Sequence, residues 1–175
     1  MAHSLQKHLG RLFAAAQFKI DQWKSVYNSA IINNPTGRAV VSGKVILQYP
    51  KHITIGDNSY INGGWLCASP NAYIKVGKNC LISYNVHIRT DMHIHHDKEK
   101  LIQEQGNKEA DIIIGNDVWI GCGAQIFGGV TLGEGCVIGA GTIVTKDVSP
   151  YEIVVGGAMR GIGERNFCFE EKKPK

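Results

Sequence analysis

The sequence predicts an all-β protein built as a parallel β-helix, in which short strands wind in coils around one axis. Its central stretch carries a large aliphatic residue at every sixth position, namely Ile114, Ile120, Ile126, Leu132, Ile138 and Val144. A small or β-branched residue stands four positions after each of the first five, namely Val118, Ala124, Val130, Cys136 and Thr142. Neither an α-helix, with about 3.6 residues per turn, nor a flat strand, with a period of two, has this rhythm.

Glycine directly follows four of these aliphatic residues, at Gly115, Gly121, Gly133 and Gly139, as expected where the chain turns a corner. Three hexads form one triangular coil, so residues about 18 apart should stack. We therefore expect Ile120 beneath Ile138, and Ile126 beneath Val144, in an interior column. A β-sandwich with glycine turns is the alternative, but it gives no reason for six positions in phase.

The same rhythm is expected upstream, in two blocks. The first block directs three residues inward, Ile55, Ile61 and Cys67, with Ser59 and Trp65 as their companions. After an insertion at Ser69-Pro70-Asn71, the second block directs four residues inward, Val76, Ile82, Ile88 and Ile94, with Cys80, Val86 and Met92 as companions.

Residues 95–111 are polar and interrupt the rhythm, so we expect them to leave the wall as an extended excursion loop. Long loops in compact domains are usually functional. We divide the chain into an N-terminal helix and linker (1–37), a β-helix domain (38–155) and a C-terminal closing segment and tail (156–175). Phe167, Cys168 and Phe169 are expected to close the domain, ahead of a charged tail.

The N-terminal segment, residues 4–30, is predicted to be an amphipathic helix with Ser4 as its N-cap. Its apolar stripe consists of Leu5, Leu9, Leu12, Ala16, Trp23, Tyr27 and Ala30, with Phe13, Ile20 and Val26 beside it. We interpret the helix as a cover for the open end of the coils. The alternative is a basic helix resting on an anionic membrane, which Asp21 and several glutamines disfavour by diluting the charge.

Composition narrows the class of protein. A net charge of +4 on 175 residues is compatible with anionic ligands but gives no argument for nucleic acid. The five cysteines lack CxxC spacing, which argues against a disulfide framework or a zinc knuckle, and Cys80 and Cys136 fall on inward positions. Without an apolar run long enough to span a membrane or a cleavable leader, we expect a cytoplasmic protein.

Four histidines cluster where the excursion loop begins: His87, His93, His95 and His96. His87 and His93 each precede an expected inward position, so both should point outward. An exposed imidazole beside a polar loop is suited to general-base catalysis near neutral pH.

At this point the chain resembles the hexapeptide-repeat O-acetyltransferases, which include galactoside and maltose acetyltransferases and the acetyltransferases of capsule and lipopolysaccharide synthesis. The resemblance rests on Asp-Ile-Ile-Ile-Gly-Asn-Asp-Val-Trp-Ile-Gly (111–121), Gly-Ala-Gly-Thr-Ile-Val-Thr-Lys-Asp-Val (139–148) and Gly-Gly-Ala-Met-Arg (156–160). It implies left-handed coils, a homotrimer, and acetyl-CoA bound between neighbouring subunits. The implied acceptor is a sugar hydroxyl, with a surface polysaccharide or its precursor as first choice, and no metal is expected.

The resemblance also implies roles for individual residues. His93 would be the general base, oriented by Asp91, with His95 as its competitor or as a substrate contact. The backbone amide of Cys122 would stabilise the oxyanion. Residues expected along acetyl-CoA are Trp119, Cys122, Ala140, Thr145, Lys146 and Arg160, and Asn62 is a candidate contact for the acceptor hydroxyl.

Two other functions remain open from the sequence. A γ-class carbonic anhydrase uses the same solenoid with zinc held between subunits, and His52, His87 and His93 have spacings close to its ligands. His52 is out of phase with the other two, and the 111–121 and 139–148 motifs would then be unexplained. The other alternative is a non-catalytic solenoid used as a scaffold.

Overall fold

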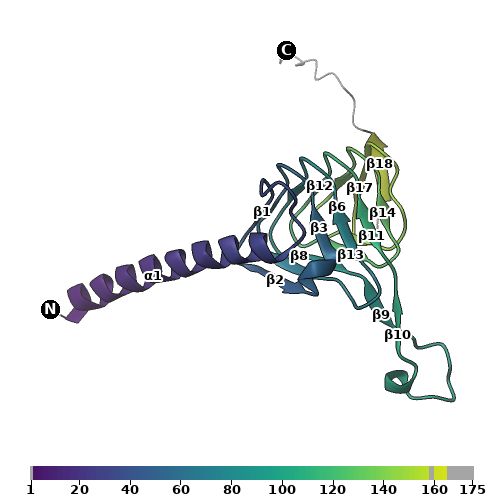
Figure 1. The fold of residues 1–175 in the computed structure, drawn as a ribbon, viewed down its shortest axis with the longest axis horizontal. Helices are drawn as coiled ribbons and strands as arrows, with labels where there is room; N and C mark the ends of the chain where they lie inside the picture. Colours follow the sequence, from purple (N-terminus) through teal and green to yellow (C-terminus); the bar gives the residue numbers. More distant parts are fainter. Residues whose placement is uncertain (1, 158–159, 165–175) are drawn as a thin grey trace, which may run out of the picture.

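A computed structural model describes residues 2–157 and 160–164, and it is a triangular parallel β-helix with one long N-terminal helix (Figure 1). The first wall consists of β3 (Ile53–Ile55), β6 (Ile74–Val76), β11 (Ile112–Ile114) and β14 (Thr131–Leu132). The second wall consists of β1 (Val40–Val41), β4 (Tyr60–Ile61), β7 (Leu81–Ile82), β12 (Trp119–Ile120), β15 (Val137–Ile138) and β17 (Glu152–Val155). The third wall consists of β2 (Val45–Gln48), β5 (Gly64–Cys67), β8 (Val86–Arg89), β13 (Gln125–Phe127) and β16 (Ile143–Val144).

The interior is the column of aliphatic side chains that the six-residue rhythm predicts. Ile120 pairs with Ile138 in the coil above it, and Ile126 pairs with Val144. All six aliphatics of the central stretch and all five of their companions are buried. The prediction of a parallel β-helix is therefore confirmed in its central coils, and the inward positions of Cys80 and Cys136 are confirmed with it.

Corners between walls depend on backbone conformations that few residues adopt. Asn58, Asn79 and Asp117 occupy equivalent corners in successive coils, each with φ between 56° and 60°. Asn and Asp tolerate this left-handed region better than other residues with a Cβ. Elsewhere the coils come too close for a side chain, since a Cβ on Gly121 would lie 2.6 Å from the backbone nitrogen of Ala140.

The predicted phase is wrong at Trp65. Five residues instead of six separate Ile61 from the next inward residue, Leu66, so Gly64 and Leu66 are buried in β5. Trp65 is consequently turned outward, 44% exposed, and its ring stacks on His87 at a centroid distance of 5.6 Å.

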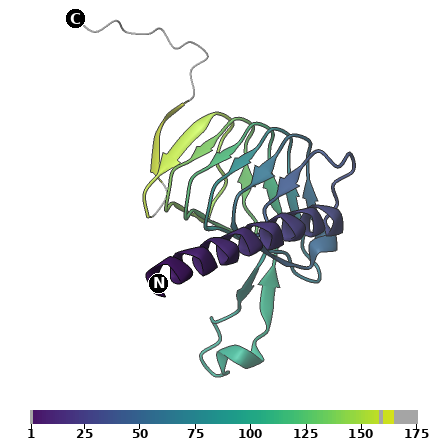
Figure 2. The ribbon, with the colours of Figure 1, turned by 90° about the vertical axis from the view of Figure 1, so that its left-hand side faces the viewer.

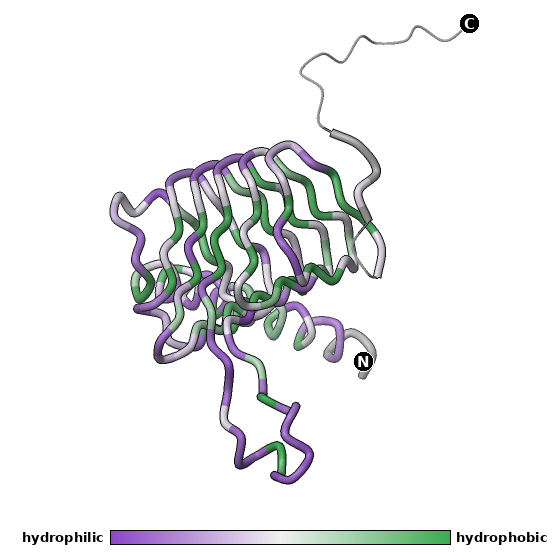
Figure 3. The backbone as a smooth tube through the Cα atoms, turned by 90° about the vertical axis from the view of Figure 1, so that its right-hand side faces the viewer, coloured by the Kyte–Doolittle hydropathy of each residue, from purple (hydrophilic) through white to green (hydrophobic). Residues whose placement is uncertain are grey.

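The phase prediction is also wrong for Met92 and Ile94, because the chain leaves the wall after Thr90, four residues earlier than the rhythm indicates. Thr90 is the last buried residue of this coil, and β9 (Asp91–His93) then pairs antiparallel with β10 (Asn107–Glu109). Together they form a hairpin, whose tip carries the 3₁₀ turn Ile102–Glu104 and which extends away from the coils (Figures 1 and 2). Figure 3 shows this hairpin as mostly hydrophilic.

Two carboxylates anchor the root of the hairpin to residues 71–75. The backbone N–H of Asn71 donates to Glu109 at 2.7 Å, and that of Tyr73 donates to Asp111 at 2.8 Å. Lys75 also pairs with Asp111 at 3.1 Å. The hydrogen bond from Tyr73 and the charge of Lys75 lower the pKa of Asp111 below its ordinary value.

Helix α1 (Ala2–Ile31) does not cover the end of the coils as we interpreted it from sequence. It begins before Ser4, so Ser4 is a helical residue and the N-cap assignment is wrong. Only its last turns contact the coils, and the rest projects as an arm (Figure 1). Its large apolar side chains are exposed, which the interpretation as a cover did not anticipate.

The chain folds back at its last described strand, β18 (Arg160–Glu164), which pairs antiparallel with β17. The expected closing residues Phe167, Cys168 and Phe169 lie outside the described residues. Among the helices that the structure describes, none combines the length and apolar character needed to cross a bilayer.

Substituting Asp for Ile126 should destabilise the fold by more than about 4 kcal/mol, because the carboxylate would be buried in the column without a partner. Gln125→Glu, which adds the same charge one residue away on an exposed position, is the matched control and should change the unfolding free energy by less than about 0.5 kcal/mol. Urea unfolding of both variants checks this. Equal stability of the two variants would contradict the inward assignment.

Asp111→Asn should weaken the hairpin root at neutral pH by at most about 1 kcal/mol, because the site is partly exposed. A carboxyl whose folded pKa is lowered stabilises the fold above its unfolded pKa of about 3.9, and this contribution is lost as pH falls through the folded value. The difference between wild type and variant should therefore be present at pH 7 and shrink at pH 3. Urea unfolding at both pH values measures it, and an unchanged difference would rule out the ionic contribution.

Candidate active site

The predicted site residues lie mainly along the two edges of the third wall. We call the edge where β4, β7, β12 and β15 lead into the third wall the entry corner, which includes residues 62–63, 83–85, 121–124 and 139–142. We call the opposite edge the exit corner, which includes residues 128–130, residues 145–148 and the hairpin root. The coil geometry alone decides which candidates share an edge.

His93 lies on the hairpin just beyond the exit corner. It is exposed on β9 opposite Asn107. Among the described residues its ring has no hydrogen-bond partner, while the His95 ring lies 3.2 Å from the His93 carbonyl oxygen through Nδ1. The His93 imidazole is therefore accessible from solvent.

Within the part of the chain that the structure describes, no hydrogen bond or ion pair joins Asp91 to His93. Its carboxylate is paired with Arg89 at 3.8 Å, on the strand that leads into the hairpin. The hairpin root itself is held tightly, since the Ala110 N–H donates to the Thr90 carbonyl at 2.9 Å and Thr90 is buried. A Cβ on Gly128, in the next coil, would lie 2.5 Å from that carbonyl oxygen.

Cys122 and Ala140 are stacked neighbours on the entry corner. The Gly141 N–H donates to the Cys122 carbonyl at 2.8 Å, and the flanking Gly121 and Gly123 amides are also bonded to the backbone of adjacent coils. Among the described residues, the Cys122 N–H donates to no acceptor. The corner thus presents an unpaired backbone donor, held by bonded residues on both sides, of the kind that stabilises an oxyanion.

The Cys122 side chain is an exposed free thiol. Burial raises the pKa of two other thiols, Cys67 and Cys80, above the ordinary value, so they stay protonated. Among the four cysteines that the structure describes, Cys122 alone has an exposed side chain that a reagent can reach.

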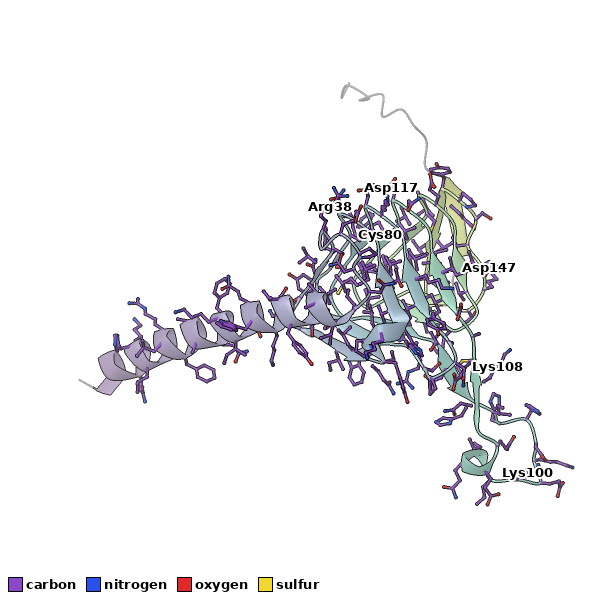
Figure 4. The ribbon with its side chains drawn as sticks, in the orientation of Figure 1. Arg38, Cys80, Lys100, Lys108, Asp117 and Asp147 are labelled. Atoms are coloured by element: carbon purple, nitrogen blue, oxygen red, sulfur yellow. The ribbon has the colours of Figure 1, made fainter. Side chains whose placement is uncertain are left out.

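Thr145 and Lys146 are exposed on the exit corner, in the coil beyond Gly128. The following residue, Asp147, fixes this corner by accepting a hydrogen bond from the Thr131 N–H at 2.7 Å. Figure 4 shows Asp147 on the coils, with Lys108 along the hairpin and Lys100 at its tip. Lys146 is thus a cation on a fixed turn, on the same edge as the hairpin root.

The remaining candidates are more scattered. Trp119 projects outward from the second wall between Leu81 and Val137, and 53% of it is exposed. Asn62 lies on the entry corner in an early coil, at a pocket shared with Phe18 of α1. Arg160 is the first residue of β18, and its backbone pairs with Val155 of β17. Its side chain is not among those that the structure describes.

The structure does not bring the two central candidates together within one chain. Six residues separate Cys122 on the entry corner from Gly128 beside the hairpin root. At about 3.3 Å per residue, the two edges are roughly 15–20 Å apart. His93 and the Cys122 amide therefore face solvent near opposite edges of the third wall.

Sequence reasoning missed the stacking of His52 and His87 on aromatic rings near these edges. The Trp65–His87 stack lies on the third wall between the corners. His52 stacks on Tyr73 at 4.5 Å beside the hairpin root, and its Nδ1 lies 2.8 Å from the Ser69 carbonyl oxygen. The Trp65–His87 stack could have been found from the spacing of five between Ile61 and Leu66. The His52–Tyr73 stack depends on the insertion Ser69-Pro70-Asn71, which does not follow the six-residue repeat.

Known proteins share both sequence and fold with this chain. The family model for bacterial transferase hexapeptide (six repeats) matches residues 111–146. The galactoside O-acetyltransferase of Escherichia coli K12 is 38% identical over 130 residues, which is 73% of this chain and 62% of that enzyme. The chain thus spans less than two thirds of the length of that curated relative.

Solved structures extend the match. A galactoside acetyltransferase in complex with coenzyme A is 34% identical, covers 82% of this chain and 72% of its own, and has a TM-score of 0.67. A hexapeptide-repeat acetyltransferase of Vibrio cholerae is 26% identical over 93% of this chain and 91% of its own, with a TM-score of 0.71. With its left-handed β-helix, the chain belongs to the hexapeptide-repeat acetyltransferase family.

Proposed function

We propose that the protein is an O-acetyltransferase that moves an acetyl group from acetyl-CoA to a sugar hydroxyl, with His93 as general base. The observation that carries this proposal is that, among the described residues, the third wall has an exposed imidazole without a hydrogen-bond partner near one edge, His93, and a backbone N–H without an acceptor at the other, that of Cys122. Relatives with a bound ligand add support, since the Vibrio cholerae protein has also been solved with acetyl coenzyme A.

The separation of these two groups leads to a statement about assembly. One chain cannot place both groups on one substrate, because the third wall lies between them. A second copy that docks its entry corner against the exit corner of the first would close the gap. We therefore propose a homotrimer whose active sites lie between subunits, each with His93 from one subunit and Cys122 from its neighbour.

The proposed reaction is direct transfer. The His93 imidazole takes the proton of the acceptor hydroxyl, and the oxygen attacks the thioester carbonyl carbon. The Cys122 N–H donates a hydrogen bond to the oxyanion that forms. When the carbon–sulfur bond breaks, the imidazolium returns its proton to the leaving thiolate, so base and acid are the same group.

The coenzyme path is proposed from the exposed residues on these edges. Lys146 supplies a fixed cation for phosphate, with Thr145 beside it on the exit corner, and the Ala140 backbone lies on the path at the entry corner. Trp119 and Arg160 extend the path over the second wall and β18. Asp91 is proposed to orient His93 through its second carboxylate oxygen, since the ion pair with Arg89 involves Oδ1.

For the acceptor, we propose a sugar of a surface polysaccharide or its precursor, contacted by Asn62 and His95. Similar proteins include galactoside and maltose enzymes as well as chloramphenicol acetyltransferases, so the acceptor is tested with a panel of sugars. The free cysteines among the described residues fit the reducing cytoplasm, where we place the enzyme.

The zinc alternative receives no support from the rings concerned. His52 and His87 are stacked on Tyr73 and Trp65, respectively. Within the described part of a single chain, no three His, Cys, Asp or Glu side chains converge as a metal site. Metal analysis of the purified protein decides the matter for the assembled oligomer, where one zinc per subunit would favour the alternative.

His93→Ala should lower the rate of transfer by about 10²–10⁴-fold, because the acceptor hydroxyl loses its base. His95→Ala, two residues away on the same hairpin, is the matched control and should lose less than about tenfold. Release of coenzyme A thiol from acetyl-CoA, measured against a panel of sugars and nucleotide sugars, checks both. If both the His93→Ala and the His95→Ala variants transferred acetyl groups at the wild-type rate, neither ring would be the base and the proposal would fail.

Cys122→Ala should keep activity within about threefold of wild type, because the proposed donor is the backbone amide and alanine retains it. Loss of activity comparable to that of His93→Ala would instead indicate a covalent acyl-cysteine route. The same thiol-release assay gives the rate, and mass spectrometry of the protein after incubation with acetyl-CoA detects any acyl adduct.

A further inference from the structure

Helix α1 is amphipathic, but it presents its apolar side to solvent. Six large side chains form one stripe along it, and each is between 55% and 79% exposed: Leu9, Leu12, Phe13, Trp23, Val26 and Tyr27. A stripe of this length on a helix that projects from the domain (Figure 1) is an unusual surface for a globular protein, and marks an interaction site.

The polar side of the helix is the side that holds it to the coils. Ser25 Oγ donates to the Val41 carbonyl at 2.9 Å, and Asn28 Nδ2 donates to the Ser42 carbonyl at 2.9 Å. At about 100° per residue, Ser25 and Asn28 lie roughly 140–200° around the axis from Trp23. The docking contacts therefore fix the helix so that its apolar stripe faces away from the domain.

The charge of the helix is mainly positive. Four basic residues, Lys7, Arg11, Lys19 and Lys24, against one acidic residue leave α1 with a net charge of +3, out of +4 for the whole chain. The acidic residue, Asp21, is half-buried against the coils, where its backbone carbonyl lies close to Gly43. At about 100° per residue, Lys19 and Lys24 lie roughly 40° and 100° from Trp23, at the stripe and its edge, whereas Lys7 and Arg11 lie on the opposite, polar side of the helix, on turns that project beyond the coils. The helix thus combines an apolar face with a basic polar face.

The composition of the stripe favours a lipid surface over a second copy of the helix. A coiled-coil seam through Leu9 and Leu12 would continue through positions 16, 19 and 23, and would bury the charge of Lys19. The stripe is rich in aromatic residues, which sit well at the boundary between headgroups and acyl chains. A lysine beside such a stripe extends its charge to the headgroups while its methylenes remain in contact with the apolar surface.

We propose that α1 is an interfacial anchor that lies in the plane of an anionic bilayer, with Leu12, Trp23 and Tyr27 inserted and its lysines on the headgroups. The coils and the hairpin then stand on the aqueous side. This proposal is independent of the acetyltransferase assignment, because no residue of the candidate site contributes to it.

Vesicle flotation of the full chain tests the anchor. The protein should float with phosphatidylcholine vesicles that contain about 30% phosphatidylglycerol, should bind pure phosphatidylcholine far more weakly, and should be released by high salt. Leu12→Glu/Trp23→Glu should abolish flotation. Lys7→Gln/Lys24→Gln should weaken it by about 25-fold, at roughly fivefold per lysine.

The matched control is Lys98→Gln/Lys100→Gln, which removes the same charge from exposed positions on the hairpin tip and should leave flotation unchanged. Failure of the wild type to float with anionic vesicles, or equal loss in the control, would overturn the proposal. Light scattering without lipid supplies the other decisive arm. An unchanged mass in Leu12→Glu/Trp23→Glu supports the anchor, whereas a fall in mass would make the stripe a subunit interface instead.

Discussion

The packing of one large aliphatic side chain per wall in each coil is the constraint on which the rest of the molecule depends. Each inward residue, such as Ile120 or Ile126, rests on its counterpart in the next coil, while parallel backbone hydrogen bonds join the coils outside the column. This stacking aligns equivalent turns in rows along the edges. Cys122 and Ala140 are neighbours for that reason alone, because neither side chain contributes to the column.

Much of the fold followed from this rhythm, and the failures have a common cause. The central coils were predictable because every hexad there is complete. Trp65 was assigned inward because a count of six passes over the missing residue before Leu66, and no local property of an indole reveals which wall position it takes. Ile94 was assigned inward because it keeps the six-residue spacing, but Thr90 is the last buried residue before the hairpin. The spacing of apolar residues does not show where antiparallel pairing replaces the wall.

The candidate site was predictable only as a set of residues. The sequence placed His93 outward at a corner. In the structure His93 is exposed, but it lies on the hairpin and not at a corner of a coil. The distance between His93 and Cys122 follows from the triangular cross-section, which a one-dimensional pattern does not carry. The pairing of Asp91 with Arg89 was equally out of reach, because it depends on side-chain geometry at the hairpin root. The roles of these residues remain predictions.

Helix α1 shows a different limit. Its amphipathic pattern was evident from the sequence, but an apolar stripe does not state what it faces. Short polar side chains, Ser25 and Asn28, make the attachment to the coils and so decide the orientation of the whole helix. In most small domains hydrophobic burial sets such an orientation, whereas here directional hydrogen bonds do.

The missing residue before Leu66 has a wider meaning for proteins of this architecture. The turn before β5 is one residue shorter than the equivalent turns, so Trp65, which a count of six places inside, faces outward and its indole meets the imidazole of His87. The length of a turn in a solenoid thus decides which side chains of the following strand face solvent. Families built this way can diversify their outer faces by altering turn lengths while the backbone ladder persists.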